Sequence, residues 1–500
     1  MMLAIALLPL TFVSPPSAFR STQHALRASQ PPRAEAFFSG TGLDDEALRI
    51  ALESQEKAAA EAARRAADEA WKQIEDALPA LAPTPPPVLT LYRDTNGWCP
   101  FCERVWLQLH AKKIPFREEL IDLRDKPEWY KEMVPTTLVP AIKYDDDGAV
   151  VWESKDIMLS LEERFSSSAE SAADGPHPAM LPPEGTAARV RVEALMESCG
   201  DLLGAGVRMS YPNASATDEE IAEAAATFEG ELGKLDAAIA EGGGPFLGGD
   251  AFSLADCMYI PMMERWAAQL PLTTGLALRE RGGGEGAARW PAIAGWLDAM
   301  EDPQLLPAYS EHVMGDRYSW VCLIGTFQRM FSSSNASATD PARAAKAKEA
   351  IRKSDAEARV ILHQLKLTPL DEHRAEHRAA AARAVFSNRA AIVADALLQE
   401  PKTQVELRRM EPEDGPLVET VLREACRRLL EIELGWDADD SYTDQPGDAA
   451  LAAIAAKYVA SRACVPRDLG APAAAALRTT LLQMADEAET YAWKASGGLL

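Results

Sequence analysis

The sequence predicts a protein of the α+β then all-α class, in which a small βαβαββα domain is followed by a long helical region. Two patterns lead to this prediction. Between residues 88 and 164, short apolar runs alternate with helical patterns and turn residues, whereas from residue 186 onward apolar residues recur at steps of three and four. The length of 500 residues fits about three domains.

The elements of the first domain follow one another closely. Strands are expected at residues 88–92, 116–122, 138–144 and 149–152, and the turn at residues 145–148 joins the last two as a hairpin. Helices are expected from residue 99 onward, at residues 126–133 and at residues 153–164. We assign residues 88–166 to this domain.

Residues 98–102 read Trp-Cys-Pro-Phe-Cys and lie where the first strand runs into the first helix. Thioredoxin-like folds expose a reactive thiol at such a junction, because the N–H groups at a helix N-terminus stabilise a thiolate and lower its pKa into the range of about 3.5–7.5. Cys99 is therefore the candidate nucleophile. Cys102, one turn further, is placed to resolve a mixed disulfide. The alternatives are two buried thiols or a structural zinc pair, but zinc needs a second Cys or His pair, and none lies nearby in the sequence.

This stretch resembles the glutathione transferase family, and within it the cysteine-type omega, lambda and dehydroascorbate reductase groups. Four segments carry the resemblance: Trp-Cys-Pro-Phe-Cys at 98–102, Arg-Asp-Lys-Pro-Glu-Trp at 124–129, Leu-Val-Pro at 138–140 and Trp-Glu-Ser at 152–154. Omega and lambda members commonly have a small residue at the position of Cys102, so the role of this second thiol stays open.

The resemblance implies a site for glutathione, used as a co-substrate, and no metal. The implied catalytic residues are Cys99 and Cys102, and the implied glutathione-binding residues are Phe101, Lys126, Val139, Pro140, Glu153 and Ser154. Val139 would pair with the peptide backbone beside a cis proline, and Glu153 and Ser154 would hold the γ-glutamyl end at a helix N-terminus. Taken singly, Pro140 fits an ordinary turn, Lys126 a solvated charge, and Glu153 with Ser154 a helix cap.

Downstream, helices are expected at residues 186–209 and 218–241. Ser253 followed by Asp256 is a capping-box pattern, and it resembles the buried N-capping box of the all-α transferase domain. We assign residues 186–315 to this domain. A further helical region of unassigned role covers residues 318–500, with helices expected at 341–365, 372–399, 417–434, 448–463 and 474–493.

The first 87 residues precede the catalytic fold. An apolar run at residues 3–13 leads to a small-residue cleavage point before Phe19, and residues 19–34 hold three Arg and no acidic residue. This pattern predicts a signal plus transit presequence over residues 1–34, which directs proteins to the plastid (chloroplast) of an alga; secretion and a mitochondrial address are the alternatives. Residues 35–87 predict a solvated helical arm followed by a Pro-rich linker.

Composition limits the possible partners. The net charge of −25 argues against nucleic acid, and the apolar run near the start is too short to span a membrane. Seven cysteines, five of them isolated, do not form a disulfide framework. We therefore expect a glutathione-dependent thiol transferase or reductase that acts on a small-molecule or protein disulfide, as a monomer or homodimer. The alternative is a non-enzymatic transferase-fold scaffold or ligand carrier whose helical tail binds a partner.

Overall fold

A computed structural model describes residues 45–81, 85–165, 177–212, 216–279, 289–332, 341–398, 410–432 and 446–496 of the chain. The chain divides into two units, residues 1–69 and residues 70–500. The predicted presequence lies outside the described residues. Helix α1 (Asp45–Ala77) begins in the first unit. Its side chains at residues 61–66 are exposed, which agrees with the predicted solvated arm.

The first domain of the second unit is built on a four-stranded sheet with the order β2-β1-β3-β4. The strands are β1 (Leu89–Asp94), β2 (Phe116–Ile121), β3 (Ala141–Tyr144) and β4 (Val150–Trp152). Strand β1 pairs parallel with β2 and antiparallel with β3, which forms a hairpin with β4. The predicted βαβαββα order is confirmed.

Three helices cover the two faces of this sheet: α2 (Pro100–Ala111), α3 (Glu128–Met133) and α4 (Ser154–Phe165). The alternation of side chains along β1 decides which face each helix meets. Leu89 and Leu91 pack in the large core with residues of α2 and α4, whereas Tyr92 packs in a smaller core with residues of α3. The loop between β1 and α2 therefore lies at the C-terminal end of β1, an inner strand of the sheet.

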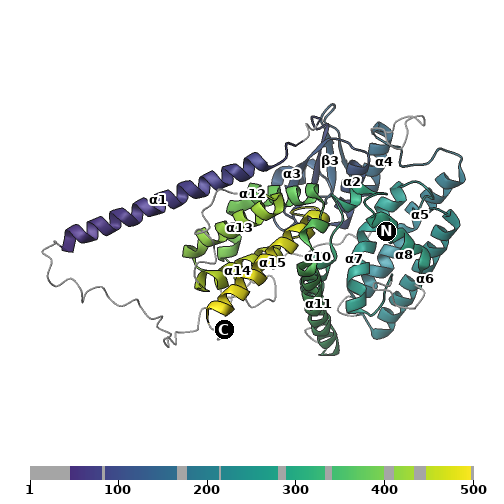
Figure 1. The fold of residues 1–500 in the computed structure, drawn as a ribbon. Coiled ribbons are helices and arrows are strands. Elements are labelled where there is room, and N and C mark those ends of the chain that lie inside the picture. The colour runs from purple at the N-terminus through teal and green to yellow at the C-terminus, as the bar shows by residue number, and fades with distance from the viewer. Residues whose placement is uncertain are drawn as a thin grey trace. The chain divides into compact units, whose positions relative to one another are not determined.

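The following helices are α5 (Ala187–Ser210), α6 (Asp218–Gly242), α7 (Leu254–Thr273), α8 (Pro291–Glu301) and α9 (Pro307–Ser310). Their buried side chains join those of α2 and α4 in one continuous core. The helical domain thus supports the side of the sheet that carries the Cys-Pro-Phe-Cys helix (Figure 1).

The predicted capping box at the start of α7 is confirmed. The Asp256 carboxylate accepts hydrogen bonds of 2.8 Å from both the backbone N–H and the hydroxyl of Ser253. Its other oxygen accepts from the Trp296 indole at 2.8 Å, so the box also ties α7 to α8. Burial raises the pKa of Asp256, and these hydrogen bonds lower it again in part.

Helix α10 (Arg317–Ser332) was not predicted. It begins where the sequence analysis ended the transferase domain, and the Asp316 carboxylate accepts the Ser319 N–H at 2.8 Å in the manner of an N-cap. Trp320 and Phe327 on α10 are buried against Ala268 of α7. The C-terminal region therefore begins with a helix that packs on α7.

The five helices expected near the C-terminus are present as α11 (Pro341–Leu367), α12 (Ala375–Leu398), α13 (Gly415–Leu430), α14 (Pro446–Arg462) and α15 (Ala471–Ala495). Residues of α12 to α15 form a second hydrophobic core (Figure 1). None of the helices in the described ranges is apolar over a stretch long enough to cross a membrane.

The last turns of α1 also belong to this second core, in contrast to the prediction of a solvated arm over the whole segment. Trp71 is 6% exposed and Ile74 is fully buried, and the Trp71 ring lies 6.0 Å from that of Phe386 on α12. Ala-rich composition hid this contact, because two large apolar residues in a long helix give little periodic signal.

Candidate functional site

Cys99 is the N-cap residue of α2, directly after the loop that follows β1. Its Sγ lies 3.9 Å from the carbonyl oxygen of Val139, and the Val139–Pro140 peptide bond is cis. The structure therefore brings together the first and third segments that carry the family resemblance. A partly exposed thiol at a helix N-terminus faces a backbone carbonyl on the neighbouring loop.

Cys102 lies one turn into α2 and is 2% exposed. Burial, followed by a hydrogen bond to Cys99, raises the pKa of Cys102 well above its usual value. The two thiols thus differ sharply in environment. Cys99 is partly exposed to solvent, whereas Cys102 is buried.

Asp94 was missed by the sequence analysis. It is the last residue of β1 and is 1% exposed. Its carboxylate accepts the backbone N–H of Trp98 at 2.8 Å and that of Cys99 at 3.3 Å, so it fixes the loop that carries the nucleophile. The available signal was an acidic residue at the end of an apolar strand pattern, directly before the turn residues at 95–97 and the Cys motif.

The ligand atoms of Asp94, Cys99 and Cys102 all lie within 4.8 Å of one another. Within the described ranges, this is the one group of at least three His, Cys, Asp or Glu side chains that converges in this way. Structural zinc sites have four protein ligands, and a fourth is missing from this group. The group is therefore one ligand short of a structural zinc site.

Lys126 lies beside the cis-proline loop. Its ammonium group donates a 2.8 Å hydrogen bond to the carbonyl of Thr137, two residues before Val139. Burial lowers the pKa of Lys126, and the nearby Lys131 lowers it further, while Cys99 acts in the opposite sense. Lys126 is thus not a fully solvated charge, and it stands close enough to Cys99 to affect a ligand there.

Glu153 and Ser154 lie at the start of α4. Glu153 has a φ of 67°, in the left-handed region that non-glycine residues rarely adopt, and Ser154 is buried. The Ser154 hydroxyl accepts a 3.4 Å hydrogen bond from the Arg104 guanidinium. The expected γ-glutamyl site therefore combines a helix N-terminus, a buried hydroxyl and a cation.

Arg104 was also missed by the sequence analysis. It is 6% exposed, lies 5.0 Å from the centre of the Phe101 ring, and donates to the Cys199 sulfur at 3.7 Å. Among the described residues, no carboxylate forms an ion pair with it. A buried cation without an acidic partner is unfavourable, so this position suits a ligand carboxylate.

Arg265 of α7 also contacts the loop before Cys99. Its guanidinium donates to the Trp98 carbonyl at 3.2 Å and pairs with Glu103 of α2 at 2.7 Å and with Glu264 at 3.2 Å. All three charged side chains are buried. Burial, together with repulsion from Glu103, raises the pKa of Glu264 well above its usual value.

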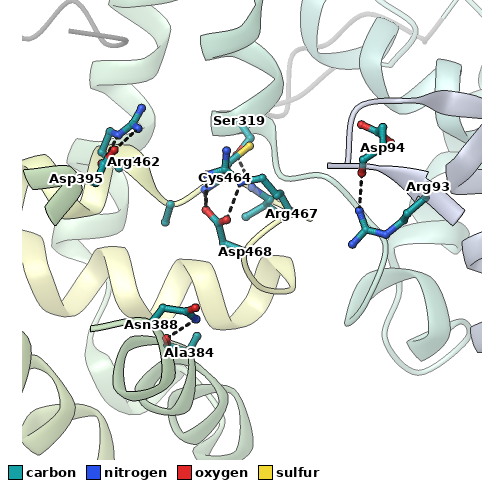
Figure 2. A network of polar contacts seen from close by, with 12 residues as sticks. Arg93, Asp94, Ser319, Ala384, Asn388, Asp395, Arg462, Cys464, Arg467 and Asp468 are labelled. Carbon is teal, nitrogen blue, oxygen red and sulfur yellow. Dashed lines mark hydrogen bonds and ion pairs between the residues drawn. The ribbon is translucent and has the colours of Figure 1, made fainter. Parts of the chain in front are cut away.

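The C-terminal region also reaches this loop. The Trp98 ring lies 6.0 Å from that of Phe327 on α10, and the backbone of Arg467 lies 3.5 Å from the position that a Cβ atom at Gly97, one residue before Trp98, would occupy. The Cys464 loop is itself fixed, because the Asp468 carboxylate accepts the Cys464 N–H at 2.8 Å and pairs with Arg467 at 2.6 Å, as Figure 2 shows. This loop belongs to the C-terminal region, for which the sequence suggested no role, and it packs beside the candidate site.

Comparisons with known proteins identify the two domains that surround this site. The model of the glutathione S-transferase N-terminal domain matches residues 98–164, and that of the C-terminal domain matches residues 218–299. Protein IN2-1 of Zea mays is 34% identical over 194 residues, which cover 37% of this chain and 71% of that protein. The chain belongs to the glutathione S-transferase family. Family members use glutathione as a co-substrate.

Two proteins of Arabidopsis thaliana are also similar to this transferase. Glutathione S-transferase L2, chloroplastic, is 30% identical over 44% of this chain and 69% of its own length. Glutathione S-transferase DHAR3, chloroplastic, is 26% identical over 33% of this chain and 54% of its own length. The transferase thus spans little more than half of this last relative.

Proposed function

We propose that this transferase is a glutathione-dependent thiol transferase or reductase with Cys99 as its nucleophile, acting in deglutathionylation or dehydroascorbate reduction. The observation that supports this most directly is the position of the Cys99 thiol, at the N-cap of α2 and 3.9 Å from the Val139 carbonyl. A thiolate is favoured at a helix N-terminus. The backbone of a bound peptide could pair with the backbone of Val139, which would place the peptide's thiol beside Cys99.

In dehydroascorbate reduction, the Cys99 thiolate adds to a carbonyl carbon and a glutathione thiolate then attacks the Cys99 sulfur. The C–S bond breaks, ascorbate leaves, and Cys99 becomes glutathionylated. For a glutathionylated substrate, the chemistry is thiol–disulfide exchange. The Cys99 thiolate attacks the glutathionyl sulfur of a mixed disulfide, the substrate thiolate leaves and takes up a proton, and Cys99 becomes glutathionylated. A second glutathione thiolate then attacks the glutathionyl sulfur, which releases glutathione disulfide and restores the Cys99 thiolate. Alternatively, Cys102 attacks Cys99 Sγ and releases reduced glutathione.

We place glutathione between the cis-proline loop and the start of α4. Val139 would pair with its cysteinyl backbone, while Phe101, Lys126 and Pro140 would line the site. The γ-glutamyl group would lie at Glu153 and Ser154. Its ammonium suits the Glu153 carboxylate, and its carboxylate suits the Ser154 hydroxyl, where Arg104 adds a positive charge. This arrangement uses every residue that the family resemblance implies.

The test uses the full chain, because the C-terminal region packs beside Trp98. Reduced protein is applied to immobilised glutathione and assayed with hydroxyethyl disulfide and with dehydroascorbate. Binding together with turnover of either substrate, lost on Cys99→Ser, is the expected result. Neither binding nor turnover would favour the rival function, a transferase-fold scaffold whose helical tail binds a partner.

We also propose that the transferase acts in a plastid as a monomer or homodimer. The predicted presequence supports the location, as do the two Arabidopsis relatives whose names include the word chloroplastic. Size-exclusion chromatography with light scattering distinguishes the monomer from the homodimer, and a larger assembly would contradict both.

A further inference from the structure

The buried carboxylate of Asp94 stands beside both thiols of the site. One of its oxygens, Cys99 Sγ and Cys102 Sγ lie within 4.8 Å of one another, and the side chain is 1% exposed. Figure 2 shows the neighbouring Arg93 guanidinium on the backbone carbonyl of Asp94, at 3.0 Å, with the carboxylate pointing away from it. Arg93 therefore does not neutralise this acid directly; its own guanidinium pairs with Glu118 at 3.0 Å.

Two backbone N–H groups hold the Asp94 carboxylate in place, those of Trp98 and Cys99. An ionised carboxylate has about four acceptor positions, so these two hydrogen bonds leave capacity for a further proton donor. Each sulfur lies within 4.8 Å of a carboxylate oxygen, a separation that one bridging water spans.

Resolution by Cys102 requires the loss of its proton. The thiol is 2% exposed, and burial raises its pKa well above the ordinary value, so ionisation into bulk water is unfavourable. Since the thiolate is the nucleophile in disulfide exchange, a buried thiol that attacks a mixed disulfide needs a nearby proton acceptor.

The other titratable groups around the two thiols are unsuited to this task. Tyr130 of α3 donates its hydroxyl proton to the Leu138 carbonyl at 2.7 Å, and burial raises its pKa. Lys126 is a cation that donates to Thr137. Glu103 is committed to Arg265 at 2.7 Å. Asp94 is the acid in the described part of the chain whose ligand atoms converge with both sulfurs.

We propose that Asp94 accepts the proton of Cys102 when Cys102 resolves the mixed disulfide on Cys99. This inference rests on the proposed thiol-transfer function. The Cys102 proton passes to the Asp94 carboxylate, and the Cys102 thiolate attacks Cys99 Sγ. The bond between Cys99 and the glutathionyl sulfur breaks, and the leaving thiolate recovers the proton from Asp94. Cys102 is oxidised, the glutathionyl sulfur is reduced, and the products are a Cys99–Cys102 disulfide and glutathione.

The test follows this single step in the full-length protein. Cys99 is first glutathionylated at low pH; the protein is then brought to neutral pH, and released glutathione is measured by mass spectrometry over time. Asp94→Asn removes the proton acceptor and leaves one amide oxygen for the two backbone N–H groups of Trp98 and Cys99, so a second comparison must separate proton transfer from positioning of the loop. We expect Asp94→Asn to slow release on the order of 100-fold, in the range of general-base catalysis. The variant rate should also rise more steeply with pH than the wild-type rate, because hydroxide must replace the carboxylate.

A second comparison separates proton transfer from positioning of the loop. In a Cys102→Ser background, added glutathione regenerates Cys99, and this external reaction needs no proton from Cys102. Asp94→Asn should therefore change the rate much less in that background than in the two-thiol protein. Equal slowing in both backgrounds would show that Asp94 only fixes the loop, and would overturn the proposal.

A measurement on the wild-type protein keeps the test valid if Asp94→Asn does not fold. The rate of resolution by Cys102 should differ between D2O and H2O at matched acidity, because the Cys102 proton is transferred before or during that step. An equal rate in the two solvents would overturn the proposal. A wild-type protein that cannot be glutathionylated at Cys99 at all would instead contradict the proposed function on which the inference rests.

Discussion

The backbone of Arg467 lies 3.5 Å from the position that a Cβ atom at Gly97 would occupy. Gly97 belongs to the turn before the nucleophile, and its φ of +68° is one that L side chains rarely adopt. A loop far along the chain therefore packs against the active-site turn. The C-terminal region is part of the surroundings of the site, and substitutions at this contact should affect activity.

Gly97→Asn tests this contact. Asn tolerates the left-handed conformation better than other side chains do, so the added atoms should act mainly by pushing against the Arg467 backbone. We expect hydroxyethyl disulfide reduction to fall at least severalfold, measured at saturating and at limiting disulfide.

Gly148 offers a matched control. Its φ is +71°, and no atom lies within 4 Å of the position of an added Cβ. Gly148→Asn should therefore leave activity close to the wild-type value. A similar loss in both variants would mean that backbone strain alone, and not the C-terminal loop, explains the effect.

The two thiols should respond differently to substitution. Cys99→Ser removes the accessible nucleophile and should abolish thiol transfer. Cys102→Ser removes a buried thiol and should retain turnover in which external glutathione regenerates Cys99. Initial rates at several glutathione concentrations measure this difference, and equal loss in both variants contradicts the assignment.

The glutathione anchor at α4 can be tested by binding. Ser154→Ala and Glu153→Ala remove candidate partners of the γ-glutamyl group, where a hydrogen bond to a charged group contributes about 1.5–3 kcal/mol. The dissociation constant for glutathione, from isothermal titration, should rise on the order of tenfold or more. Ser160→Ala, on the same helix but bonded to Tyr144 at 2.8 Å, is the control. Wild-type affinity in both anchor variants would exclude this site.

Acid should destabilise the transferase through His110. Its ring stacks on His312 with centroids 4.6 Å apart, and burial, then His312 and Arg93, lower its pKa from 6.5 to about 3. Between these values the unfolded chain binds the proton and the folded chain does not. Stability from neutral His110 is therefore present above about pH 6.5 and is lost as the pH falls toward 3, at about 1.4 kcal/mol per pH unit.

His110→Phe keeps an aromatic ring and removes this titration. Urea unfolding between pH 7 and pH 4.5 should show a shallower loss of stability in this variant than in the wild type. His363→Gln, at an exposed position on α11, should leave the slope unchanged. Parallel pH profiles for wild type and His110→Phe would rule out this source of acid sensitivity.

A reporter fused to residues 1–40 tests the presequence. In an alga with a complex plastid it should enter the plastid, and Phe19→Ala should stop it before the inner membranes, because Phe19 becomes the first residue after signal cleavage. Fluorescence microscopy gives the location. A cytosolic reporter, or import unaffected by Phe19→Ala, would contradict the targeting prediction.

Local sequence patterns were sufficient for most of the elements. The four strands, the helix at Cys99 and the five C-terminal helices were predicted because periodicity and caps are encoded within a few residues. Helix α10 was missed although Asp316 caps its start, since the segment lacks a clear break from the preceding helical domain.

The sequence by itself predicted the candidate nucleophile and the second thiol, and its resemblance to a known family implied the cis proline and the residues expected to hold glutathione; the structure confirms the cis peptide bond. Only the tertiary structure decided that Asp94 stands beside both sulfurs, that Arg104 is a buried cation at Ser154, and that Arg467 approaches Gly97. The physical reason is that a sequence motif specifies the reactive groups only within a short stretch of the chain. The burial of a side chain and the charges near it depend on which faces of the helices and the sheet pack together, and this packing involves the whole hydrophobic core.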